Sequence, residues 1–213
     1  MSTQYDQEAE VEQLRRWWRE NWLPVVAGLA LGLAAIYSWQ AWTKHRDRKD
    51  AEASHIFSDL GTAADANKYA DAAGMADRLA KDFDDTPYAA DAALRIARLA
   101  VESDKLDDAR ARLEWAAAHG RDAGVRAIAR LHLARVLLAQ GKKDEAMKQL
   151  DGDAGTFGPL FDEERGDIQL AQGNRAGARA AYQKALQAQP SDSKSRDGLQ
   201  RKIDDLADVA DRS

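Results

Sequence analysis

The longest apolar stretch of the sequence covers residues 22–42 and contains no charged side chain. As a helix, such a stretch is long enough to cross the hydrocarbon core of a bilayer, about 30 Å thick. Five of the 6 tryptophans lie at or near its ends, with Trp17, Trp18 and Trp22 at one end and Trp39 and Trp42 at the other. Tryptophan gathers at both membrane interfaces, whereas a buried core helix has no reason to place it at both ends. The pattern therefore predicts a transmembrane helix over residues 22–42.

The residues around this stretch favour an uncleaved anchor over a signal peptide. Residues 1–21 form a long leader that mixes acidic and basic side chains, and the stretch ends in bulky side chains around Trp39. Signal peptides have a short basic start and small residues at the cleavage site. No glycine or proline occurs between Gly32 and Gly61, so we expect the helix to continue beyond the membrane through Ile56.

The basic residues beside the span give a weak indication of orientation. Three precede the span and four follow it, which favours by one charge a cytoplasmic location for the C-terminal part. They are Arg15, Arg16 and Arg19 before the span and Lys44, Arg46, Arg48 and Lys49 after it.

One face of the span carries small residues. Gly28 and Gly32 form a GxxxG pair, and Ala35 lies on nearly the same face. Such a face allows a second helix to approach closely, so we predict helix packing at these three positions. GxxxG pairs also occur in spans by chance, and this alternative stays open.

Beyond the span, residues 43–213 alternate helical stretches with short polar breaks. The clearest unit is RGDIQLAQGNRAGARAAYQKALQAQP. Its small residues let two antiparallel helices pack closely, its tyrosine fills the space between hairpins, and its proline ends the second helix. The residues concerned are Gly166 in the first helix, Gly173 at the turn, and Ala178, Tyr182, Ala185 and Pro190 in the second helix. These spacings resemble the tetratricopeptide repeat.

Earlier hairpins repeat the pattern more weakly. Ala134 and Gly141 take the places of Gly166 and Gly173 in the preceding unit, 32 residues earlier. The unit before that has Ala97 in the first helix and Asp104, not glycine, at the turn. A more degenerate pair occupies residues 51–87, with apolar positions Phe57, Leu60, Leu79 and Phe83.

The fold class follows from these units. After Pro190, a last helix carries Leu199, Ile203 and Leu206 on one face, as a capping helix does. The sequence thus predicts an all-α fold, in which an N-terminal transmembrane helix precedes a tetratricopeptide-repeat-like α-solenoid of helical hairpins with a C-terminal capping helix. A generic alanine-rich bundle is the alternative.

The amino-acid composition excludes several kinds of partner and binding site. The chain has 213 residues, 45% hydrophobic residues and a mean hydropathy of -0.60, so its apolar residues are mostly small helix formers. The net charge of -5 provides no basic footprint for phosphates, and we therefore expect no nucleic-acid partner. The absence of cysteine excludes disulfides and thiolate metal sites.

Motifs for catalysis are missing. The 4 histidines occur singly, and none belongs to a zinc-binding pair such as HExxH. The adjacent carboxylates fall at turns or on polar helix faces, and the loop beginning at Asp151 lacks the central glycine of a calcium loop. We predict no catalytic, cofactor-binding or metal-binding residues. A membrane-tethered hydrolase using His132 and Asp167 is a remote alternative.

The whole chain resembles the YfgM family of Gram-negative bacteria, on the combination of the segment WWRENW, the span and the LRIAR, LHLAR and RGDIQLAQGNRAGARAAYQKAL hairpins. This resemblance implies an inner-membrane protein with a cytoplasmic segment over residues 1–21, the span, and a periplasmic repeat domain over residues 43–213. It implies an ancillary, chaperone-like subunit of the SecYEG translocon that works with the membrane-anchored peptidyl-prolyl isomerase PpiD. The implied orientation contradicts the charge count, and we follow it because long domains are translocated largely regardless of such a bias.

Two functional hypotheses share this fold. The first is a non-enzymatic adaptor that binds partner proteins or emerging secretory chains beside the translocon. The second is a scaffold for cell-envelope assembly or stress signalling. The sequence does not separate them.

In repeats of this kind, the first helices of successive hairpins line a concave face. We assume that Ala97, Ala134 and Gly166 face the second helices of their own hairpins. The groove residues then lie three residues before, one residue after and four residues after each of them. The predicted partner-binding residues are Leu94, Arg98 and Val101, then Leu131, Arg135 and Leu138, then Glu163, Asp167 and Leu170. The leucines are core residues in an alternative register. We expect charge reversal of Arg98 and Arg135 to weaken binding without lowering the thermal midpoint.

Overall fold

The computed structural model describes residues 3–190, 193 and 195–208, and every regular element in this part of the chain is a helix. The predicted all-α fold is confirmed. The chain divides into two compact units, Met1–Lys49 and Asp50–Ser213.

Helix α1 covers Thr3–Asp65. Its part up to Lys49 belongs to the first unit, and its remainder belongs to the second. Its apolar stretch is long enough to cross a membrane, and no part of that stretch is buried against protein. Leu29 and Leu31, for example, are 65% and 73% exposed. An interpretation as a soluble core helix does not fit these side chains, and α1 contains a candidate membrane span. The helix continues not only through Ile56, as expected, but to Asp65.

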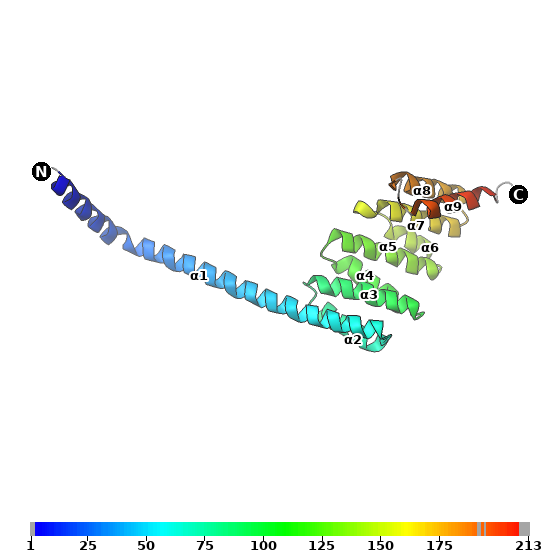
Figure 1. Ribbon diagram of the computed structural model, residues 1–213, viewed down its shortest axis with the longest axis horizontal. Coiled ribbons are helices and arrows are strands. Elements are labelled where there is room, and N and C mark those ends of the chain that lie inside the picture. The colour runs from blue at the N-terminus through cyan, green and yellow to red at the C-terminus, as the bar shows by residue number, and fades with distance from the viewer. Residues whose placement is uncertain (1–2, 191–192, 194, 209–213) are drawn as a thin grey trace. The chain divides into compact units, whose positions relative to one another are not determined.

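The second unit is a series of helical hairpins (Figure 1). The part of α1 after Lys49 packs with α2, and α3, α5 and α7 each pack with the helix that follows them. A short 3-10 helix, η1, precedes α7. The bounds are α2 Tyr69–Asp82, α3 Pro87–Glu102, α4 Leu106–His119, α5 Ala123–Ala139, α6 Lys143–Gln149, η1 Gly155–Phe157, α7 Gly158–Ala171, α8 Arg175–Ala188 and α9 Ser195–Asp208.

Four hairpin turns share one backbone geometry. Each contains a residue with positive φ, namely Asn67 (53°), Asp104 (57°), Gly141 (76°) and Gly173 (83°). The amide after each of these residues donates to the carbonyl five positions earlier, for example Lys142 to Leu137 at 2.8 Å. This is the Schellman ending of a helix, which requires a left-handed residue. The expected role of Asp104 is confirmed, and Asn67 shows that the first, degenerate hairpin ends its helix in the same way.

Close packing of small residues forms the core. Ala97 and Ala134 are buried as predicted, at 1% and 0% exposure. Gly166 leaves room for Tyr182, because a Cβ at Gly166 would lie 2.3 Å from the Tyr182 ring. Tyr182 in turn packs against the apolar face of α9, which buries Leu199 and its neighbours. The capping role predicted for the last helix is therefore confirmed.

Candidate partner-binding groove

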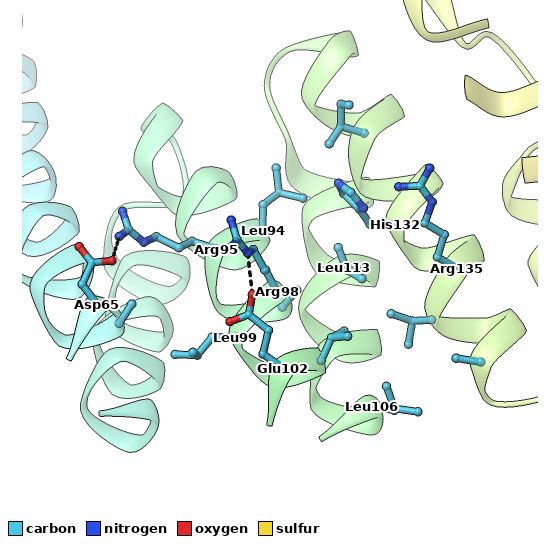
Figure 2. Close-up of a pocket in the computed structure, with 16 residues that line it drawn as sticks. Asp65, Leu94, Arg95, Arg98, Leu99, Glu102, Leu106, Leu113, His132 and Arg135 are labelled. Carbon is cyan, nitrogen blue, oxygen red and sulfur yellow. Dashed lines mark hydrogen bonds and ion pairs between the residues drawn. The ribbon is translucent and has the colours of Figure 1, made fainter. Parts of the chain in front are cut away.

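A groove of about 860 Å³ opens on the repeat unit between the end of α1 and helices α3, α4 and α5 (Figure 2). We call it the α3–α5 groove. It is lined by Ala64, Asp65, Leu94, Arg95, Ala97, Arg98, Leu99, Val101, Glu102, Leu106, Leu113, Ile128, His132, Arg135, Val136 and Ala139.

The groove offers apolar surface to a ligand. Val101 is 43% exposed although it is a large aliphatic residue, and Leu94, Leu106 and Ile128 are half-buried. Burial of such surface releases roughly 25 cal/mol per Å². The groove therefore exposes apolar surface whose burial would be favourable.

Arginines form the polar part of the groove. Arg95 Nη2 donates to Asp65 Oδ1 at 2.7 Å, and Arg98 Nε donates to Glu102 Oε1 at 2.8 Å (Figure 2). The Arg98 side chain is 80% exposed. Exposed pairs contribute little to stability, so Arg98 can exchange Glu102 for an acidic group of a partner at small cost.

Arg135 differs from Arg98 because it pairs with a buried residue on another helix. Its Nε donates to Glu164 Oε2 on α7 at 2.7 Å, and the Glu164 side chain is only 4% exposed. Burial raises the pKa of Glu164, against the opposing effect of Arg135. Arg135 therefore compensates a buried carboxylate, although its side chain is 45% exposed and lines the groove.

His132 lies beside Arg135 at the groove surface (Figure 2). Partial burial lowers its pKa, and the neighbouring positive charge of Arg135 lowers it further. Both effects disfavour the positively charged form of the imidazole at this place in the groove.

Ion pairs join successive first helices at three junctions. Between α3 and α5, both of which are fully described, no ion pair joins the helices, and the α3–α5 groove opens at this junction. The three joined junctions use Arg95 with Asp65 (α1 and α3), Arg135 with Glu164 (α5 and α7), and Lys202 with Glu163 and Asp167 (α7 and α9).

The structure brings only some of the predicted groove residues together. Leu94, Arg98, Val101 and Arg135 line the groove. Leu131 is 1% exposed and belongs to the core, so we leave it out of the binding surface.

The remaining predicted positions lie outside the groove. Leu138 is half-buried and packs against the core, whereas Leu170 is 39% exposed. Glu163 and Asp167 pair with Lys202 of α9 at 2.9 and 2.8 Å. Both carboxylates therefore pair with the capping helix and lie outside the residues that line the α3–α5 groove.

Sequence reasoning missed Arg95, Asp65 and Leu106. Asp65 belongs to the first, degenerate hairpin, for which the sequence predicts no groove positions. Arg95 lies two residues before Ala97, outside the spacing used for the groove, and Leu106 belongs to a second helix. The left-handed Asn67, found at the same place as Asp104, is a signal that would have identified the first hairpin's register.

The small-residue face of the span is open. A side chain added at Gly28 or Gly32 would meet no atom within 4 Å. Helix packing at Gly28, Gly32 and Ala35 stays a prediction.

Among the residues that the structure describes, no group of three or more histidine, aspartate or glutamate side chains is arranged to hold a metal ion. Asp153, in the loop compared above with a calcium loop, instead accepts a hydrogen bond from the Gly155 amide at 2.8 Å.

The sequence is similar to several known bacterial proteins along most of its length. A protein named ancillary SecYEG translocon subunit from Escherichia coli is 28% identical over 199 residues, which cover 93% of this chain and 95% of that protein. Proteins of the same name from Haemophilus influenzae (28%; 88% of this chain, 92% of the relative) and Neisseria gonorrhoeae (28%; 97% and 100%) are similar to it as well. They confirm the resemblance to the YfgM family.

The family profile described as "Tetratricopeptide repeat-like domain" matches residues 15–208, which include the candidate span as well as the hairpins. The four turns of shared geometry and the small residues at the hairpin crossings agree with this match. The chain therefore belongs to the tetratricopeptide repeat-like domain family.

Proposed function

We propose that this protein is a membrane-anchored, non-catalytic adaptor associated with the SecYEG translocon. The observation that carries the proposal is the α3–α5 groove, an apolar and arginine-lined surface on a repeat unit that follows a candidate span. Relatives of matching length named as translocon subunits support the association.

We place residues 1–21 in the cytoplasm and the repeat unit in the periplasm, with the span in the inner membrane. Gly28, Gly32 and Ala35 provide the face for a translocon helix. In inverted membrane vesicles, the repeat unit is expected to resist added protease; complete digestion in intact vesicles would contradict this orientation.

The groove is expected to bind segments of partner proteins that combine apolar and acidic side chains. Val101 and Leu94 provide apolar contacts, and Arg98 provides a charge for carboxylates. The partners we propose are PpiD and emerging secretory polypeptides, which matches a chaperone-like role at the exit of a channel.

The test is an affinity purification of the full-length protein in mild detergent. The variant R98E/V101Q reverses the exposed charge of Arg98 and replaces the exposed apolar side chain of Val101, and neither residue belongs to the buried core. We expect it to recover several-fold less partner protein than the wild type, while SecYEG is retained through the span.

A matched control is R179E/A180Q, which makes the same kind of changes at exposed positions of α8. It should recover partners like the wild type. Equal recovery by R98E/V101Q and the control would contradict the groove, and absence of SecYEG from every sample would contradict the translocon association. Dominance of envelope-synthesis proteins in the wild-type sample would favour the scaffold instead.

A further inference from the structure

Basic side chains cluster directly after the apolar part of α1. Four basic residues and one acidic residue, Asp47, lie between positions 44 and 49, a net charge of +3. Lys44, Arg46 and Arg48 are exposed on the helix surface.

Along the axis of α1, these three basic residues follow directly after Trp39 and Trp42, the tryptophans at this end of the span. The Trp39 and Trp42 rings form a tilted pair with centroids 5.4 Å apart, and tryptophan of a spanning helix lies at the level of the headgroups. At 1.5 Å per residue, the three cations lie about 3, 6 and 9 Å beyond Trp42 along the axis. This places them at the outer part of the interface, where lipid phosphates lie.

Arg46 contacts Trp42, one of these tryptophans. Its guanidinium carbon lies 5.6 Å from the centroid of the Trp42 ring, as in a cation–π contact. A guanidinium presents five N–H donors, and a contact with one ring leaves donors that can bind a phosphate in a fork. The contact with Trp42 therefore keeps the Arg46 guanidinium close to the tryptophan residues at this end of the span.

Lys44 and Arg48 lie on the side of the helix opposite to Arg46. They are four residues apart and share one face, whereas Arg46 is turned by about 200° from Lys44. The long side chains of all three can bend along the helix axis to reach headgroups. Cations thus meet the lipids around α1 on two sides.

We propose that Lys44, Arg46 and Arg48 bind the phosphate groups of anionic phospholipids in the leaflet at this end of the span, with Arg46 on Trp42 as the main contact. The proposal rests on the membrane anchoring proposed above and holds for either orientation. Each cation at an anionic surface raises the affinity about fivefold. This binding also explains basic residues that the orientation proposed here places on the side disfavoured by the positive-inside rule.

The test uses the full-length protein in micelles doped with equal amounts of phosphatidylglycerol and phosphatidylcholine, and native mass spectrometry counts each retained lipid. The wild type is expected to retain phosphatidylglycerol about tenfold or more over phosphatidylcholine. K44Q/R46Q/R48Q should lose most of this preference, and R46Q alone about fivefold of it. The control K68Q/K81Q/K148Q removes three exposed charges from the repeat unit and should keep the preference.

Insertion into nanodiscs of phosphatidylcholine alone reports anchoring separately, and all variants should insert. An unchanged preference in K44Q/R46Q/R48Q, or a wild type without preference, would overturn the lipid proposal and leave the anchor intact. Failure of the wild type to insert would instead overturn the anchor.

Discussion

The α3–α5 and α7–α9 junctions occupy equivalent places in the repeat unit but differ in what meets the first helix. At α7–α9, Lys202 pairs with Glu163 and Asp167, and Tyr182 donates a hydrogen bond to Asp167 at 2.7 Å. At α3–α5, the position equivalent to Asp167 is Arg98, which pairs with Glu102 of its own helix. A charged repeat position is thus paired across the junction where the next helix supplies an opposite charge, and stays exposed where it does not.

Arg98 and Arg135 sharpen this comparison because each follows the small residue at its hairpin crossing. R135E should lower the free energy of unfolding by about 3 kcal/mol, since the substitution leaves buried Glu164 beside a like charge. R98E should leave the thermal midpoint unchanged, because Arg98 is highly exposed. Thermal unfolding followed by circular dichroism measures both.

This result would revise the expectation from sequence that both arginines can be reversed without loss of stability. Equal midpoints for R135E and R98E would show that the α5–α7 pair is not structural.

Gly166 tests how closely the α7–α8 crossing is packed. A methyl group there would overlap the Tyr182 ring, so G166A should destabilise the protein by about 2–3 kcal/mol despite the better helix propensity of alanine. G198A on α9 is the control, because a Cβ at that position meets no atom within 4 Å. It should raise stability by up to about 1 kcal/mol. Chemical unfolding of the two variants distinguishes them, and a neutral G166A would contradict the close approach.

Lys202 tests whether α9 is held by charge as well as by apolar packing. K202M keeps the aliphatic chain but leaves Glu163 and Asp167 without this cation, and we expect a loss of about 1 kcal/mol. Hydrogen exchange should accelerate in α9 while α3 and α5 keep their protection. K202R should restore most of the protection; if it does not, the contact depends on something other than charge.

The smallest expected effect is the pH dependence due to Glu164. Burial raises its pKa above the ordinary value of 4.5, so the folded state binds this proton more strongly than the unfolded state. The resulting stability is full below the ordinary pKa and is lost as the pH rises through the raised value. The free energy of unfolding of the wild type minus that of E164Q should therefore fall between pH 4 and pH 7. A difference that rises over this range would contradict the assignment.

Parts of the fold were predictable because they depend on local chemistry. A run of apolar residues bounded by tryptophan indicates a span wherever it occurs, and Gly141 and Gly173 mark turns because a left-handed residue is needed there. Ala97, Ala134 and Gly166 identified the hairpin crossings, since only small side chains allow such close approach.

Which residues form the groove was decided by tertiary structure. Each helical residue turns the side chain by about 100°, so a small difference in helix rotation moved Leu131 from the expected groove into the core. Arg135 and Glu164 are 29 positions apart, and Lys202 and Glu163 are 39 apart. The sequence by itself determined the helices, the turns and the candidate span, because these depend on neighbours along the chain. Only the packing of hairpins decided which charges are paired across helices, and that leaves the junction between α3 and α5 open to a partner.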